Sequence, residues 1–197
     1  RAWLASILTY IGLLVQGVGV AWLMVEIADD DAMVAWVQSA IYLPLMLLSI
    51  PAGAIADVYN KKTVSLVGLI IAFLASLFLY MIASMGMATP LLLLSLCIMT
   101  GVGMALYDPA WQTAVPLIVP EEALPQAIGL RSMSQNLARA VAPAIGGVLV
   151  AWLGGAGAFL CATLFFTPFL VVLITWHYKP TPPRLPPERI DHAITTG

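Results

Sequence analysis

Six long stretches of the sequence consist almost wholly of apolar residues, and short polar or glycine-rich breaks separate them. Each stretch is at least as long as the about 20 residues that an α-helix needs to cross the hydrocarbon core of a bilayer. The apolar residues run continuously and do not alternate at period 2, which excludes a membrane β-barrel. The pattern therefore predicts an all-α membrane protein with six transmembrane helices. We expect these helices at residues 3–27, 32–56, 63–86, 90–113, 132–153 and 156–178.

The composition supports this interpretation. Hydrophobic residues make up 61% of the chain and charged residues only 9%, whereas soluble domains carry about 25% charged residues. The net charge of -2 gives no reason to expect a nucleic-acid partner. Cys97 and Cys161 both lie in apolar runs, where small buried hydrophobic residues are the simplest interpretation. We therefore predict no metal site, no disulfide and no cofactor.

The positions of the basic residues predict the orientation. All of them lie in or near the N-terminus, the second and fourth breaks, and the C-terminal tail, which share one side of a six-span protein. They are Arg1, Lys61, Lys62, Arg131, Arg139, Lys179, Arg184 and Arg189. The opposite side carries acidic or uncharged breaks. By the positive-inside rule, both ends of the chain are cytoplasmic.

The predicted bundle occupies residues 1–178, and a proline-rich tail follows at residues 179–197. Proline-rich segments are semi-extended spacers. We interpret this tail as a cytoplasmic linker toward a second membrane half that this chain lacks. The alternative is a disordered terminus.

Four charges of alternating sign are predicted near the cytoplasmic border of the membrane. Asp57 ends the second span and Lys61 follows four residues later. Asp108 lies about 27 Å along the fourth span, and Arg139 lies two turns into the fifth from the same side. Ionisable groups at this depth are costly unless they pair, so we expect a charge network of Asp57, Lys61, Asp108 and Arg139. The alternative is that each side chain reaches the headgroups separately.

The second break carries a recognisable signature. Gly53, Asp57, Lys61 and Lys62 match the pattern Gly-x-x-x-Asp-x-x-Gly-Arg/Lys-Arg/Lys, which resembles the loop signature of the major facilitator superfamily of transporters. Asn60 replaces the usual second glycine and can also adopt left-handed turn geometry. The resemblance implies that Asp57 and Lys61 belong to a cytoplasmic gate, with Gly53, Lys62 and the rest of the charge network.

A second match lies in the fifth span. Gly129, Ala138, Ala142-Pro143 and Gly146-Gly147 follow the spacing Gly-x8-Gly-x3-Gly-Pro-x2-Gly-Gly, with alanine at two glycine positions. This resembles the antiporter motif of the efflux branches of the superfamily. Small residues at these positions let helix backbones approach closely. The resemblance implies a close-packed bend in the fifth helix.

Residues 108–139 are similar to the bacterial subgroup of enterobactin-exporter-like and drug efflux permeases. The resemblance covers nearly the whole chain as the N-terminal half of a twelve-span transporter, in which spans 1, 2, 4 and 5 line the cavity. It makes the polar and aromatic residues on those spans substrate-cavity candidates. They are Gln16, Gln38, Tyr42, Trp111, Gln112, Gln135 and Asn136. The alternative for each is an interhelical hydrogen bond, worth about 0.6 kcal/mol.

The resemblance implies a secondary active transporter of the bacterial inner membrane, not an enzyme. We expect proton-coupled efflux of small amphipathic molecules, drug or siderophore-like, by alternating access. Its partners are then the substrate, protons, the lipid bilayer, and either the missing six-span half or a second copy of the chain. One alternative is a half-size six-span interaction protein or homodimer without independent transport. A membrane enzyme is disfavoured because the spans hold no paired aspartates at mid-depth, no histidine cluster and no Ser/His pair.

Overall fold

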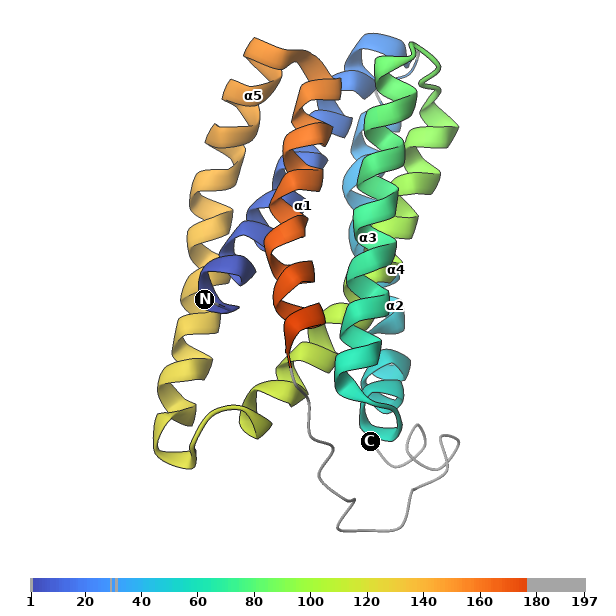
Figure 1. Ribbon diagram of the computed structural model, residues 1–197. Coiled ribbons are helices and arrows are strands. Elements are labelled where there is room, and N and C mark those ends of the chain that lie inside the picture. The colour runs from blue at the N-terminus through green and yellow to red at the C-terminus, as the bar shows by residue number, and fades with distance from the viewer. Residues whose placement is uncertain (1, 29, 31, 177–197) are drawn as a thin grey trace.

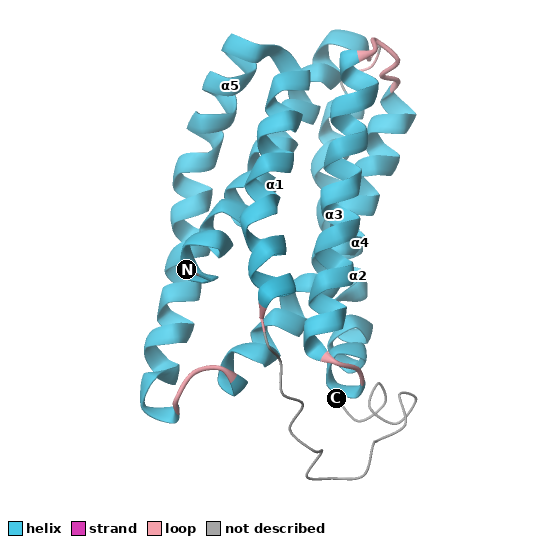
Figure 2. Cartoon of the chain, in the orientation of Figure 1, coloured by secondary structure: helices cyan, strands magenta, loops and turns pink. Residues whose placement is uncertain are grey.

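The computed structural model describes residues 2–28, 30 and 32–176, without the side chain of Asp57. The predicted linker at 179–197 lies outside these residues. The long helices are α1 (Ala2–Ile27), α2 (Ala32–Val58), α3 (Lys61–Ser84), α4 (Pro90–Ala114) and α5 (Leu124–Thr175), with two short 3-10 helices, η1 (Val115–Leu117) and η2 (Glu121–Ala123), between α4 and α5. Most of the long helices lie along one common direction, α1 crosses the bundle obliquely, and the loops occur at the two ends of the bundle (Figures 1 and 2). Over the described residues this arrangement confirms the predicted all-α class.

The described chain has five long apolar helices where the sequence predicts six. The last two predicted spans form one element, α5, which contains a single non-helical residue, Gly154, with φ 70° and ψ -179°. Only glycine adopts this backbone conformation without strain. The chain reverses direction there (Figure 1). We call residues 124–153 the first arm of α5 and residues 155–175 its second arm.

The break between α2 and α3 differs from the expectation in one respect. Asn60 has φ -62° and ψ 113°, so it is extended and not left-handed. Its side-chain oxygen accepts hydrogen bonds from the backbone N–H groups of Lys62, at 3.0 Å, and Thr63, at 3.3 Å. Asparagine is a favoured N-cap residue because it satisfies amides that the first turn leaves unpaired. Asn60 therefore starts α3 directly, and no left-handed residue is needed.

Close contacts between glycines and neighbouring backbones join the helices. A Cβ atom added to Gly101 of α4 would lie 2.3 Å from the carbonyl oxygen of Ile41 in α2, and one added to Gly68 of α3 would lie 2.5 Å from the carbonyl oxygen of Gly103 in α4. Small residues of this kind let membrane helices pack tightly without a hydrophobic driving force. Helix α4 is therefore packed between α2 and α3, while α1 packs mainly on α5.

Candidate functional site

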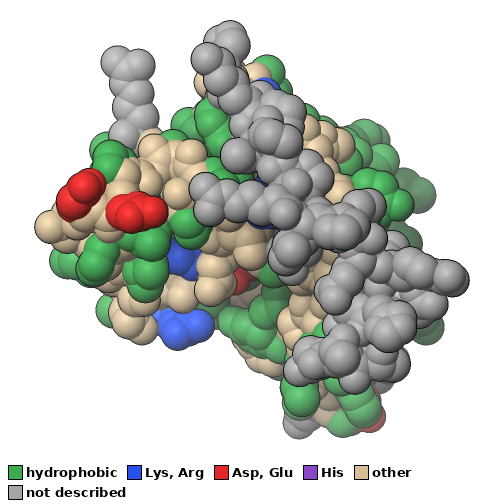
Figure 3. All heavy atoms as spheres, turned by 90° about the horizontal axis from the view of Figure 1, so that it is seen from below, with side chains coloured by type: hydrophobic (Ala, Val, Ile, Leu, Met, Phe, Trp, Pro, Cys, Tyr) green, Lys and Arg blue, Asp and Glu red, His purple; other side chains and the backbone are tan. Residues whose placement is uncertain are grey.

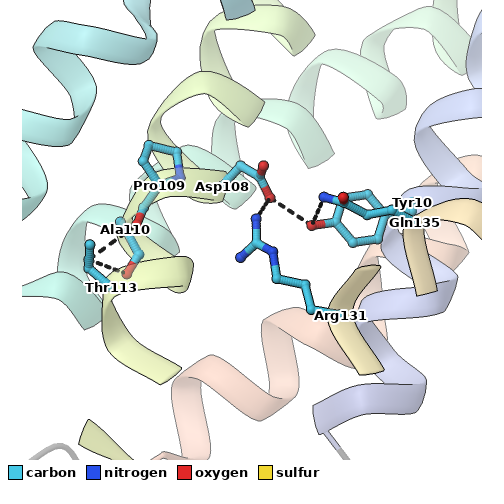
Figure 4. A network of polar contacts seen from close by, with 7 residues as sticks. All are labelled: Tyr10, Asp108, Pro109, Ala110, Thr113, Arg131 and Gln135. Carbon is cyan, nitrogen blue, oxygen red and sulfur yellow. Dashed lines mark hydrogen bonds and ion pairs between the residues drawn. The ribbon is translucent and has the colours of Figure 1, made fainter. Parts of the chain in front are cut away.

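The carboxylate of Asp108, in the last third of α4, joins three helices. Its Oδ1 atom accepts a hydrogen bond from the Tyr10 hydroxyl of α1 at 2.7 Å and forms an ion pair with the Arg131 guanidinium of α5 at 2.8 Å. The Gln135 side-chain amide donates to the Tyr10 hydroxyl at 3.0 Å. Figure 4 shows these four side chains converging between the helices. We call Tyr10, Asp108, Arg131 and Gln135 the Asp108 cluster.

The cluster is only partly open to solvent, since the side chains of Arg131 and Asp108 are 16% and 29% exposed. Charge-assisted hydrogen bonds are about twice as strong as neutral ones, and here they offset part of the desolvation of the two charges. Arg131 and Gln135 are four residues apart, which places them on one face of the first arm of α5. The cluster therefore holds α1, α4 and α5 together at one end of the bundle.

The ion partner of Asp108 lies outside the predicted charge network. That network consists of Asp57, Lys61, Asp108 and Arg139, whereas the Asp108 carboxylate forms its ion pair with Arg131. The reason is that α5 begins at Leu124, eight residues before the expected start at 132, so Arg131 lies on the helix and not in a loop. The Lys61 ammonium donates to the carbonyl oxygen of Ala56 at 3.2 Å. The side chain of Asp57 lies outside the described part of the chain, and Gly53 has open space around it.

Lys62 links the start of α3 to the end of α5. Its ammonium donates to the carbonyl oxygens of Ile174, at 3.1 Å, and Trp176, at 2.5 Å. The last carbonyl groups of a helix lack intrahelical partners, and a lysine can satisfy them. The second lysine of the signature thus caps the second arm of α5. Figure 3 shows this end of the molecule, where a few charged side chains lie among hydrophobic ones.

Two cavities meet at Asp108. The larger, of about 610 Å³, lies between α2 and α4 and is mostly apolar, with Leu43, Met46, Pro109 and Gln112 among its lining residues. The smaller, of about 80 Å³, is lined by residues of α1, α2, α4 and α5. Its lining residues are Tyr10, Leu13, Leu14, Tyr42, Leu45, Met104, Asp108, Gln135 and Arg139. Tyr42, Leu45 and Asp108 line both cavities.

The seven substrate-cavity candidates fall into three groups. Tyr42, Gln112 and Gln135 line the two cavities. Gln16 and Trp111 are buried in the bundle: the Gln16 amide donates to the Thr100 hydroxyl at 2.8 Å, and the Trp111 ring makes edge contacts with aromatic rings near the end of α5. Gln38 and Asn136 are exposed on α2 and α5 and are not among the residues that line these two cavities.

The antiporter-motif residues divide in a similar way. Ala138 and Ala142 are fully buried, and a Cβ atom added to Gly146 would lie 3.0 Å from Val18 of α1. Gly129 and Gly147 have open space around them. Pro143 lies inside α5. Three of the six positions therefore serve close packing within this chain.

Tyr10 and Arg131 are the members of the Asp108 cluster that the sequence prediction missed. The positions 131, 135 and 139 are spaced by four residues, and this spacing marks them as one helix face once α5 is extended to Leu124. Tyr10 gives no such signal, because it is one tyrosine within an apolar run. Among the described residues, no group of three or more His, Cys, Asp or Glu side chains has the arrangement of a metal site.

Comparisons with known proteins agree with this architecture. The family model described as "Transmembrane secretion effector", a major facilitator superfamily family, matches residues 1–197. The staphyloferrin A transporter of Staphylococcus aureus is 25% identical over 178 residues, which are 90% of this chain and 45% of that protein. The multidrug efflux pump Tap of Mycolicibacterium fortuitum is 30% identical over 73% of this chain and 38% of the pump. Tap of Mycobacterium tuberculosis is 28% identical over 77% of this chain and 38% of the pump.

The chain spans less than half the length of these curated relatives. The family match confirms the resemblance that the two motifs indicate, and the family consists of transporters and not of enzymes. With its long apolar helices, this chain is a membrane protein that belongs to the transmembrane secretion effector family of the major facilitator superfamily.

Proposed function

We propose that this chain is the N-terminal, six-span half of a secondary active transporter that expels small amphipathic molecules by alternating access in exchange for protons. Similarity to the multidrug efflux pump Tap supports the direction of transport, and similarity to the staphyloferrin A transporter supports a small-molecule substrate. The chain aligns with less than half of each relative, as one half of a two-bundle transporter would. In this proposal the second half, or a second copy of the chain, completes the cavity.

The length of α5 supports six crossings. Its 52 residues would measure about 78 Å as one straight helix, while the hydrocarbon core of a bilayer is about 30 Å thick. One crossing cannot accommodate this length. Two crossings with the reversal at Gly154 account for it, and they return both ends of α5 to the cytoplasmic side.

The observation that carries the proposed mechanism is the Asp108 cluster beside the two cavities. An ion pair that ties α1, α4 and α5 together at one end of a cavity is suited to hold that end in one conformation. We propose that the cluster forms the cytoplasmic gate together with the signature residues Gly53, Asp57, Lys61 and Lys62. Arg139 then belongs to the cavity, and the antiporter-motif residues to the helix packing that transmits the movement.

The test is efflux from membrane vesicles that contain the full-length protein. We expect an imposed pH gradient to drive efflux of a fluorescent amphipathic dye, and collapse of the gradient with an ionophore to stop it. Asp108→Asn is expected to lower the rate about tenfold, since the loss of the charge-assisted bonds removes about 1.4 kcal/mol or more from the closed state. The matched control is Ser95→Ala, which removes an exposed hydroxyl on the same helix whose hydrogen bond is to its own helix.

Three outcomes would contradict the proposal. Efflux that does not exceed that of vesicles lacking the protein would favour the half-size interaction protein instead. Efflux that continues without any ion gradient would contradict the proposed coupling to protons. Equal efflux rates for Asp108→Asn and the unaltered protein would contradict the proposed role of Asp108 in the gate.

A further inference from the structure

Arg139 is exposed on the first arm of α5, at the edge of the smaller cavity, and forms no ion pair with a described residue. It follows Arg131 and Gln135 at four-residue spacing on the first arm of α5 and lines the smaller cavity with Asp108 and Tyr42. Across the part of the chain that the structure describes, no carboxylate forms an ion pair with its guanidinium. The nearby carboxylate of Asp108 is already engaged twice through Oδ1.

The charges around the two cavities therefore do not cancel. Asp108 and Arg131 compensate each other as an ion pair, so one positive charge remains, on Arg139. This residue lies 15 positions after the start of α5, about 22 Å along the helix. An ionised side chain within a membrane span marks a functional site by default. The guanidinium of Arg139 is exposed beside the smaller cavity, so it is open to an anionic ligand, and none of the described residues supplies an anion to it.

We infer that Arg139 anchors the carboxylate of an organic anion whose apolar body lies in the larger cavity. This inference rests on the proposed function and names its substrate class. The guanidinium presents a planar fork of N–H donors that matches both oxygens of a carboxylate. Beside it, across the shared wall at Tyr42 and Leu45, the larger cavity offers Leu43, Met46 and Pro109 to an apolar body. Gln112 and Ser39 add neutral hydrogen-bonding groups there.

A cationic substrate fits the same charges less well. Asp108 is the one acidic residue among those that line the two cavities, and Arg131 neutralises it. A cation would also lie near Arg139, where like charges repel. The net positive charge of the residues at the two cavities therefore favours a negatively charged ligand.

The experiment compares two probes of nearly equal shape, 2-naphthylacetate and its neutral amide, by isothermal titration calorimetry on the purified full-length protein. We expect the carboxylate to bind at least about tenfold more tightly than the amide, which is about the effect of one charge-assisted interaction. Arg139→Gln is expected to abolish this preference, because it lowers the affinity for the carboxylate much more than the affinity for the amide. Arg139→Lys is expected to keep part of it, because lysine retains the charge but not the planar fork. If Arg139→Gln does not yield folded protein, Arg139→Lys tests the same preference.

Equal affinities of the unaltered protein for the two probes would overturn the inference. An equal loss of affinity for both probes in Arg139→Gln would also overturn it. That result would mean that Arg139 pairs with a carboxylate of the full-length protein outside the described residues. The vesicle assay separates this failure from failure of the proposed function. If the protein exports a neutral dye along the gradient but binds the two probes equally, only the proposed substrate class is wrong. If it binds the carboxylate through Arg139 but exports nothing, only the proposed transport is wrong.

Discussion

Replacement of Asp108 by asparagine tests how strongly the ion pair holds the bundle together. Asparagine keeps the size of the side chain and one carbonyl oxygen, so the hydrogen bonds from Tyr10 and Arg131 can still form. What the substitution removes is the negative charge. It also leaves the Arg131 guanidinium, 16% exposed, without a counter-charge.

The structure supports an estimate of the cost. A hydrogen bond to a charged group contributes about 1.5–3 kcal/mol and a neutral one about 0.5–1.5 kcal/mol, so each of the two bonds at Oδ1 loses about 1 kcal/mol. Solvent screening lowers this sum because both side chains are partly exposed. We expect Asp108→Asn to lower the free energy of unfolding by about 1–2 kcal/mol. A double-mutant cycle with Arg131→Gln should give a coupling energy of about 1 kcal/mol.

The assay is equilibrium unfolding of the purified protein in mixed micelles, titrated with sodium dodecyl sulfate and followed by circular dichroism. Arg139→Gln is the matched control for Arg131→Gln. It removes a guanidinium group from the same face of α5, but this guanidinium forms no ion pair with a described residue. We expect it to change the free energy of unfolding by less than about 0.5 kcal/mol. A coupling energy near zero between Asp108 and Arg131, or an equal effect of Arg139→Gln, would refute the reasoning.

Three further substitutions test the packing of the bundle. Gly101→Ala should cost about 3 kcal/mol and lower the midpoint of thermal unfolding, because its Cβ would lie 2.3 Å from the carbonyl oxygen of Ile41. Gly147→Ala is the control and should leave the midpoint unchanged, because the space around Gly147 is open. Equal midpoints for the two variants would contradict the close approach of α2 and α4. Lys62→Met should speed hydrogen exchange in the last turn of α5, where about 1 kcal/mol of local stability is lost, and unchanged exchange there would contradict the capping role. Gly154→Ala should cost about 1–3 kcal/mol through backbone strain alone, because its surroundings are open and its φ is 70°; a midpoint equal to that of Gly147→Ala would contradict the turn.

The sequence predicted the helical class well because the bilayer leaves few alternatives. Apolar runs of this length must satisfy their backbone groups internally, which limits them to helices or closed barrels. It did not predict that the chain stays helical from Leu124 through the expected loop. Pro125 at the first turn does not interrupt a helix there, since its missing N–H group would be unpaired in any case. Hydropathy alone could not detect this polar first part of α5.

The site was predicted less completely for a related reason. Asp108 stood out as a short charged side chain within an apolar run, but its ion partner depended on where α5 begins. With α5 starting at Leu124, Arg131 moves onto the helix face that meets Asp108, and Arg139 moves two turns away. The packing of Tyr10 against this pair is a tertiary contact between residues 98 positions apart, which local pattern cannot supply.

The most direct test of the account is the number of times that α5 crosses the membrane. In a variant with Cys97 and Cys161 replaced by alanine, single cysteines are introduced as Glu122→Cys before α5 and Trp152→Cys beside Gly154. Trp152 lies two residues before the reversal at Gly154 and is 82% exposed, so its side chain is not packed inside this bundle. We expect a membrane-impermeant thiol reagent added outside intact cells to label Trp152→Cys, and to label Glu122→Cys only after the cells are opened. Labelling of both positions from the same side would contradict the two crossings of α5, and with them the six-span half on which the proposed transport depends.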